Sequence, residues 1–385
     1  MYSAQVIGAG PTGALAALAL ADAGWQVAIT DPLDRDALLA RSRAYAFSHS
    51  SQRLLDGLGL WPALAQVMVP FRQLQLQDLG ARAAVLFSVA DLGPRLTRQP
   101  NGAVGWIAQH RPVLGLLLDR LAAHPAITLQ LGQTQTPREA DLVVAADGPH
   151  SPTREALGIG LCQWTYRQSC LTALVQLRGS AVDEAWELLR PEGPFAILPL
   201  GEGLVQVVWS APQGRCRQLE SLGDAAFLDA LAGALPDRFQ PDALLDQPRA
   251  FPVSLQWARR QHRGHTVLVG ESGHRCHPVG GQGLNLCWRD VAQLHRLAQR
   301  VTSGRLAVER LPAAYGRSRW PDLALTLAAT DGLVRLFSNR SPVLLPLRRL
   351  VLALMARLPL LRRSRPNFLV ALCTLSSEQP SLAAI

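Results

Sequence analysis

The sequence contains no lysine, so all 38 of its basic side chains are arginine. Its six cysteines form no C-x-x-C pair and no Cys/His cluster at zinc spacing. A disulfide scaffold and a structural zinc module are therefore excluded, no metal site is predicted, and a reducing, cytoplasmic compartment is expected. No apolar run reaches the roughly 20 residues that span a bilayer. The N-terminus also lacks the basic segment of a secretory signal.

Acidic residues are scarce at the C-terminal end, which carries most of the net charge of +9. From Arg335 to Ile385, eight arginines stand against one acidic residue, Glu378. The rest of the chain is nearly neutral, which argues against nucleic-acid binding. Apolar blocks, the last at Leu358–Leu361, alternate with these arginines, so residues 336–385 are predicted to form an Arg-rich helical region. It either faces the surface of an anionic bilayer or caps the protein body.

The first 31 residues predict a strand, a glycine-rich turn, a helix and a second strand. The turn is a G-x-G-x-x-G motif, and Asp31 ends the second strand. Its glycines permit a tight turn and a close backbone approach to a pyrophosphate at a helix N-terminus. Asp31 can accept a hydrogen bond from a ribose hydroxyl and disfavours a 2′-phosphate, so FAD or NAD fits better than NADP. The expected cofactor residues are Gly8, Gly10, Pro11, Thr12, Gly13 and Asp31.

The remainder of the chain alternates two kinds of pattern. Helices are expected over 41–62, 112–123 and 284–300, and buried strands over 140–146 and 266–269. Between them, β-rich runs at 169–177, 196–200 and 204–209 predict an antiparallel sheet. We therefore expect an α/β fold with a Rossmann-like FAD-binding domain interrupted by an antiparallel β-sheet substrate domain, and a helical C-terminus. The expected bounds are 1–70, 101–165 and 252–335 for the first domain, 71–100 and 166–251 for the second, and 336–385 for the C-terminal region.

Three further segments accompany the glycine-rich turn in order along the chain. They are Arg43, the run Asp147-Gly148-x-x-Ser151-x-x-Arg154, and the long segment from Gly270 through His274, Pro278 and Gly281-Gln282-Gly283 to Asn285 and Asp290. Together they resemble the FAD-dependent aromatic hydroxylases, group A flavoprotein monooxygenases with the p-hydroxybenzoate hydroxylase fold. Segments 43–48, 193–199 and 331–339 are most similar to the ubiquinone-biosynthesis hydroxylase branch.

The resemblance implies an FAD cofactor and NAD(P)H as a transient reductant. It implies that Arg43 binds the pyrophosphate and that a residue of the His110–Arg111 pair, taken as His110, makes another contact. A helix N-terminus near Gly283 would stabilise the negative charge of the reduced flavin. The remaining implied cofactor residues are Asp147, Gly148, Glu271, Pro278, Gly281, Gln282, Gly283, Leu284 and Asn285. Glu271 replaces the usual Asp, and the stretch 128–141 is short. No catalytic residue is identified.

The function implied is hydroxylation of the aromatic ring of a polyprenylated phenol or quinone precursor with NAD(P)H and O₂. Expected partners are this lipophilic substrate, the inner face of the membrane and other quinone-biosynthesis enzymes. Three alternatives stay open: a hydroxylase of small soluble aromatics, an oxygen-independent FAD-dependent isoprenoid reductase or cyclase, and a non-catalytic flavoprotein subunit. Trp209 and Trp257 belong either to the substrate pocket or to the core. The sequence leaves open the ring position, isoprenoid length, electron donor and oligomeric state.

Overall fold

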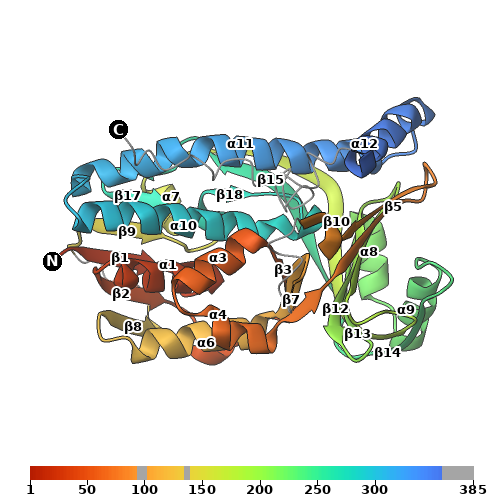
Figure 1. Ribbon diagram of the computed structural model, residues 1–385, viewed down its shortest axis with the longest axis horizontal. Coiled ribbons are helices and arrows are strands. Elements are labelled where there is room, and N and C mark those ends of the chain that lie inside the picture. The colour runs from red at the N-terminus through yellow and green to blue at the C-terminus, as the bar shows by residue number, and fades with distance from the viewer. Residues whose placement is uncertain (93–101, 134–138, 358–385) are drawn as a thin grey trace.

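A computed structural model describes residues 1–92, 102–133 and 139–357, which form two parts joined by long strands (Figure 1). The first part is built on a six-stranded sheet with β1 near its centre. Five of its strands run parallel, and β16 pairs antiparallel at the edge. In spatial order the strands are β16 (His262–Arg263), β17 (Thr266–Leu268), β9 (Leu142–Ala145), β1 (Ser3–Ile7), β2 (Gln26–Asp31) and β8 (Ile127–Leu131).

Helices cover this sheet and bury its central strands β1 and β9. Helix α1 is alanine- and leucine-rich, and its residues from Gly13 to Ala21 are all buried. It packs between α10 and α6, and Trp25 and Trp288 are fully buried nearby. The helices of this part are α1 (Pro11–Asp22), α2 (Arg35–Leu39), α3 (His49–Gly57), α4 (Trp61–Leu64), α6 (His110–Ala123), α7 (Pro152–Ala156), α10 (Gln282–Thr302) and α11 (Leu311–Phe337).

A three-stranded antiparallel sheet joins the two parts, in the order β3 (Ala44–Phe47), β7 (Gly105–Gln109), β4 (Val69–Phe71). The prediction of helix over 41–62 is wrong for 44–47. The leucine stripe that suggested a helix begins only at Leu54, whereas 44–47 pairs residue by residue with β7. Helix begins at His49, in α3.

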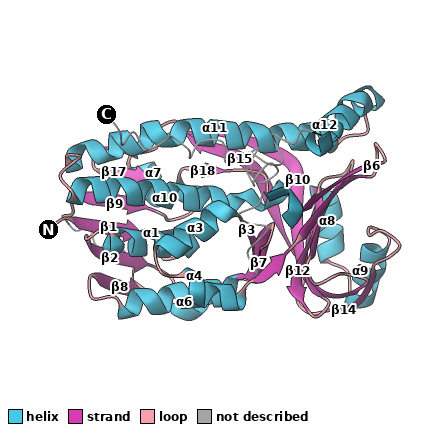
Figure 2. Cartoon of the chain, in the orientation of Figure 1, coloured by secondary structure: helices cyan, strands magenta, loops and turns pink. Residues whose placement is uncertain are grey.

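The second part is a large, mostly antiparallel sheet, which confirms the predicted fold class (Figure 2). Among the strands that the structure describes, only β11 and β5 pair in parallel within it. The strands in spatial order are β18 (His274–Arg275), β15 (Arg249–Ala258), β10 (Leu161–Arg178), β13 (Leu204–Pro212), β12 (Phe195–Gly201), β11 (Glu184–Leu189), β5 (Gln73–Asp78) and β6 (Ala83–Ser88), with β14 (Gln240–Leu244) also paired to β10.

The two faces of this sheet have different neighbours. One face packs under α8 (Gln213–Glu220) and α9 (Asp224–Ala232), in a core that contains Trp209, Phe195 and Phe227. Trp209 therefore belongs to the core and not to a substrate pocket. The opposite face is turned toward the nucleotide part and α11, where Trp257 packs against a second core cluster.

The predicted domain boundaries fall within strands that serve both parts. Strand β10 runs through 165/166 and β15 through 251/252, and their pairing shifts register between Thr165 and Ser169. The 70/71 boundary falls inside β4. The segments 71–100 and 336–385 extend beyond the described residues, as does the short 128–141 stretch in part. The domain bounds therefore stay a prediction.

The C-terminal region continues from α11 into α12 (Leu345–Arg357), and the apolar block 358–361 lies outside the described residues. Leu352 and Met355 of α12 pack against Leu76 and Val85 of the large sheet. Within the described ranges, no helix combines the length and the apolar character that crossing a bilayer requires.

Candidate cofactor and substrate site

Three glycine-containing loops meet at the carboxyl edge of the parallel sheet because their strands, β1, β9 and β17, are neighbours. The backbones of these loops approach one another too closely for a side chain to replace the glycine hydrogen at Gly8, Gly13 or Gly270. A Cβ on Gly13 would lie 1.8 Å from the Gly8 carbonyl oxygen, and one on Gly8 would lie 2.4 Å from that of Ala146. A Cβ on Gly270 would lie 2.9 Å from Cγ2 of Thr12. These glycines therefore fasten the three loops together.

The N-terminus of α1 opens outward beside this junction. Gly10 is the N-cap residue, with extended backbone and no side-chain cap, and Pro11 occupies the first turn. A Cβ on Gly10 would meet nothing within 4 Å. The free amides of the first turn and the positive end of the helix dipole can bind a pyrophosphate, and the open space at Gly10 leaves room for it.

Asp31 lies at the end of β2 and is buried. Its two carboxylate oxygens accept hydrogen bonds from the Ala9 amide at 2.7 Å and from the Leu33 amide at 2.9 Å. The side chain thus ties the glycine-rich turn to the second strand. A carboxylate retains further lone pairs for a ribose hydroxyl, and that role for Asp31 stays a prediction.

His110 begins α6 and is buried. Its Nε2 lies 2.8 Å from the Leu38 carbonyl oxygen, so Nε2 carries the proton, and Nδ1 accepts the Tyr45 hydroxyl at 2.8 Å. Burial lowers the pKa of His110. Both ring nitrogens are therefore used by the protein, whereas the neighbouring Arg111 is exposed. Arg43, half-buried, places its guanidinium 6.0 Å from the ring centroid of Phe251.

The loop after β9 is built by local hydrogen bonds. Ser151 caps α7 by accepting from the Arg154 amide at 3.0 Å, and Asp147 accepts from the Thr153 amide at 3.0 Å. Arg154 is buried and donates to the Ser272 carbonyl at 3.0 Å, which joins this loop to the one after β17. A Cβ on Gly148 would meet open space.

The segment from Pro278 leads directly into α10. Gly280 and Gly281 both have left-handed backbones, with φ of 67° and 63°. A Cβ on Gly281 would touch Cβ of Ala46 at 2.9 Å, whereas one on Gly283 would meet nothing within 4 Å. Helix α10 begins at Gln282 with no side-chain cap, so its first amides are free for the cofactor.

Asn285 uses its whole side chain within the protein. It donates to the carbonyls of Ala46 and Gly281 at 2.7 and 2.9 Å, and accepts from Ser48 and Ser51 at 2.9 and 2.7 Å. It therefore locks α10 onto β3 and α3, and a cofactor would meet its backbone amide. Its neighbour Leu284 is half-buried against the core of the nucleotide part.

Glu271 is partly exposed on the loop after β17, 3.8 Å from Arg275. Its charge acts on Tyr45, whose pKa is raised to about 12 by burial, and on Cys287, whose pKa burial raises well above its usual value. Glu271 therefore lies between β3 and α10. This position suits the ribityl contact expected of it, which stays a prediction.

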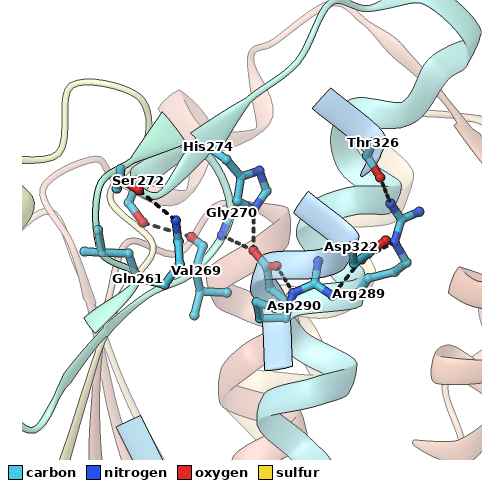
Figure 3. A network of polar contacts seen from close by, with 12 residues as sticks. Gln261, Val269, Gly270, Ser272, His274, Arg289, Asp290, Asp322 and Thr326 are labelled. Carbon is cyan, nitrogen blue, oxygen red and sulfur yellow. Dashed lines mark hydrogen bonds and ion pairs between the residues drawn. The ribbon is translucent and has the colours of Figure 1, made fainter. Parts of the chain in front are cut away.

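A buried ion network holds this edge of the sheet (Figure 3). Asp290 of α10 accepts from the Gly270 amide at 2.8 Å, from His274 Nε2 at 2.6 Å and from Arg319 Nε at 2.6 Å. Asp322 binds both Arg319, at 2.6 Å, and Arg289, at 2.9 Å. The network joins the Gly270 loop to α10 and α11.

Burial alone would raise the pKa of Asp290, but attraction to His274 and Arg319 and the hydrogen bonds outweigh it and lower the pKa to about 2. The sequence motif pointed to His274 and Asp290. It missed Arg289, Arg319 and Asp322, because no local spacing marks ion partners on a different helix.

The residues present fit FAD on two counts. The close glycine contacts fasten the loops, whereas Gly10, Gly148 and Gly283 each face open space. Three buried polar atoms at these loops also have no partner among the described residues: Asp147 Oδ1, His277 Nε2 and Gln282 Oε1. Buried polar groups are normally satisfied, so such atoms indicate a bound group.

The three glycine-containing loops that follow β1, β9 and β17 therefore define a flavoprotein. Residues 1–326 match the protein family described as FAD binding domain, and the chain belongs to that family. It is an FAD-dependent monooxygenase, which confirms the cofactor and the enzyme class implied by the resemblance.

Two relatives carry informative names. The chain is 33% identical to the ubiquinone hydroxylase UbiL of Rhodospirillum rubrum, over 98% of this chain and 91% of that protein. It is 30% identical to the 3-demethoxyubiquinol 3-hydroxylase of Escherichia coli, over 95% of this chain and 98% of that protein. The predicted similarity to the ubiquinone hydroxylase branch is confirmed.

Solved structures share the fold. PqsL of Pseudomonas aeruginosa, a probable FAD-dependent monooxygenase, has a TM-score of 0.75 at 18% identity, covering 91% of this chain and 99% of its own. HpxO of Klebsiella pneumoniae complexed with FAD and uric acid has a TM-score of 0.71 at 18% identity, covering 91% and 92%.

Proposed function

We propose that this enzyme hydroxylates the aromatic ring of a polyprenylated phenol or quinone precursor, with NAD(P)H as the transient reductant. The observation that carries the proposal is the nearly full-length similarity to two enzymes named as acting on ubiquinone or its precursors. The apolar inner face of the large sheet, opposite the flavin loops, supports a lipophilic ring. Its proposed partners include other quinone-biosynthesis enzymes.

Each part of the site has a task in this reaction. Bound FAD would supply the redox chemistry, taking electrons from the nicotinamide and activating O₂. The N-terminus of α1 and Arg43 would hold the pyrophosphate, and the free amides of α10 would offset negative charge on the reduced ring. The sheet would bury the substrate beside the Pro278–Gly281 loop and exclude water.

A coupled assay tests this proposal. Purified protein should be yellow, and a short-chain polyprenyl phenol should stimulate both NAD(P)H oxidation and O₂ consumption and yield a product heavier by one oxygen atom. Nicotinamide oxidation without O₂ uptake would favour a reductase or cyclase. No substrate-stimulated turnover would favour a non-catalytic subunit. Turnover only with small soluble phenols would favour a hydroxylase of small soluble aromatics.

We further propose that α12 binds the inner face of the membrane, where such a substrate resides. Four apolar side chains spaced by four, three and four residues are exposed: Val343 (81%), Leu347 (46%), Leu350 (54%) and Leu354 (44%). Exposed Arg340 and Arg349 flank this stripe and match an anionic surface.

One arginine of α12 is turned toward the protein body. Arg348 is buried and donates at 2.7 Å to the carbonyls of Leu336 and Asn339. The C-terminal turn of α11 leaves carbonyls without helical donors, and this guanidinium satisfies them. The outward face is therefore the apolar stripe.

Replacing Leu347 and Leu350 together by aspartate should weaken binding to vesicles of phosphatidylcholine and phosphatidylglycerol by at least about 10-fold, because two inserting side chains are lost. Vesicle co-sedimentation measures this. Val182→Asp, an equally exposed site (55%) away from α12, is the matched control. Equal binding by the double variant and the control would contradict the proposal.

A further inference from the structure

Glu187 of β11 is a buried carboxyl group with no cationic partner. It is 7% exposed, and no ion pair to it is found within the described ranges. Glu184 on the same strand, 8% exposed, shows the usual arrangement: its Oε2 lies 2.7 Å from Arg238. A buried acid is seldom left unpaired, because desolvation penalises the charged form. Glu187 therefore requires an explanation that packing does not provide.

Its side chain lies on the face of the large sheet that is turned toward the nucleotide part. Side chains alternate along a strand, and Trp186 packs into the core under α8 and α9. Ala185 and Leu189, on the same face as Glu187, pack with Ile107 of β7 and with α11, respectively. Glu187 thus lies between the two parts of the protein.

Glu187 also lies near the loop that leads into α10, because the Gly280 amide acts on its carboxyl group and lowers its pKa. Its neighbours across the sheet are apolar: Ala196 on β12 and Leu76 on β5. The carboxyl group is therefore placed at the junction of the large sheet and the loop that leads into α10, in apolar surroundings.

Burial raises the pKa of Glu187 to about 7, against the lowering effect of the Gly280 amide. Burial shifts the pKa of two other titratable groups on neighbouring elements away from neutrality. Burial raises the pKa of the Cys170 thiol on β10, which also senses Arg43, to about 12 and lowers that of His277 to about 3. Asp78, further along β5 on the same face, accepts from the Gly80 amide. Of the three groups with shifted pKa values, Glu187 has the one that lies near neutral pH.

We propose that Glu187 is a catalytic residue that accepts the proton of the substrate's ring hydroxyl, an assignment that rests on the proposed hydroxylase function. The O–H bond breaks, its electron pair stays on the substrate oxygen, and the carboxylate becomes a carboxylic acid. The resulting phenolate makes the ring carbon richer in electrons for oxygen transfer. When that carbon has lost its hydrogen as a proton to water, Glu187 returns its own proton to the phenolate oxygen.

A binding experiment tests the contact without turnover. 4-tert-Butylphenol and its methyl ether, 4-tert-butylanisole, are titrated calorimetrically into the FAD-loaded protein at pH 8. Wild type should bind the phenol more tightly, and Glu187→Leu should reduce this preference about 10-fold while ether binding is kept. An apolar side chain there removes an unpaired buried acid, so the variant should stay folded. Glu184→Gln is the matched control and should behave as wild type.

The pH profile provides the second readout. Wild-type kcat/KM should rise with pH through about 7, since the base must be ionised. In Glu187→Gln, kcat/KM should no longer rise with pH and should be about 100-fold lower than in wild type. Glu187→Asp should partly restore both the rise and the magnitude of kcat/KM. An unchanged profile, or equal loss of phenol, ether and FAD binding, would overturn the assignment. A wild type that binds the phenol selectively through Glu187 but never consumes O₂ would instead overturn the proposed function.

Discussion

Gly13→Ala is expected to abolish FAD binding and to destabilise the protein by about 3 kcal/mol or more. The new Cβ would lie 1.8 Å from the backbone oxygen of Gly8 and 3.2 Å from Cβ of Ala146. No side-chain rotation relieves a clash with backbone, so α1 must move away from β1. Urea unfolding of the apoprotein and fluorescence titration with FAD measure the two effects.

Gly10→Ala separates cofactor binding from folding in the same motif. Gly10 has an extended backbone with φ of −64°, which alanine adopts, and its Cβ would meet no protein atom within 4 Å. The variant should unfold like wild type yet bind FAD at least about 10-fold more weakly, because the methyl group occupies the space left for the phosphates. Unchanged FAD affinity in Gly10→Ala would show that the cofactor does not use this helix end.

Asp290→Asn should cost about 3 to 5 kcal/mol of unfolding free energy, the usual loss when one member of a buried ion network is neutralised. His274 would lose its anionic partner, Arg319 would keep only Asp322, and the Gly270 amide would lose a charged acceptor. Because Gly270 begins the flavin loop after β17, FAD affinity should fall as well. Asp22→Asn is the control: its pair with His295 is exposed, so less than about 1 kcal/mol is expected.

The pH dependence of this effect has a defined sign. The pKa of Asp290 is lowered from 3.8 to about 2 in the folded protein, so its stabilisation is complete above about pH 4 and is lost as the pH falls toward 2. The difference in unfolding free energy between wild type and Asp290→Asn should therefore shrink between pH 4 and pH 2. A difference that stayed constant over this range would show that the charge of Asp290 contributes nothing.

The nucleotide half of the fold could be predicted because its signals are local. A short apolar strand, a glycine-rich turn and an alanine-rich helix followed by Gly24 specify β1 and α1 within some twenty residues. The same applies to the strand before Asp147 and to the start of α10. In each case the residues that form the element also carry its stop signals.

Other features depend on partners far along the chain. Ala44–Phe47 has no strand signal of its own and becomes one by pairing with β7. Asn285 was predicted as a cofactor residue by its motif, yet its side chain binds Ala46, Ser48 and Ser51. Glu187 appeared in no motif at all. Its significance comes from the face of β11 on which it lies, which depends on sheet register.

The order of strands in the parallel sheet has a consequence for biosynthesis. β17 sits beside β9 in space, but its residues follow every strand of the large sheet except β18 in the chain. On the ribosome, the edge of β9 therefore stays uncovered until residues 266–268 emerge, and the loop that receives the flavin ring follows only after them. Cofactor capture must be a late event, and nascent chains that stall before this point would expose an apolar strand edge to aggregation.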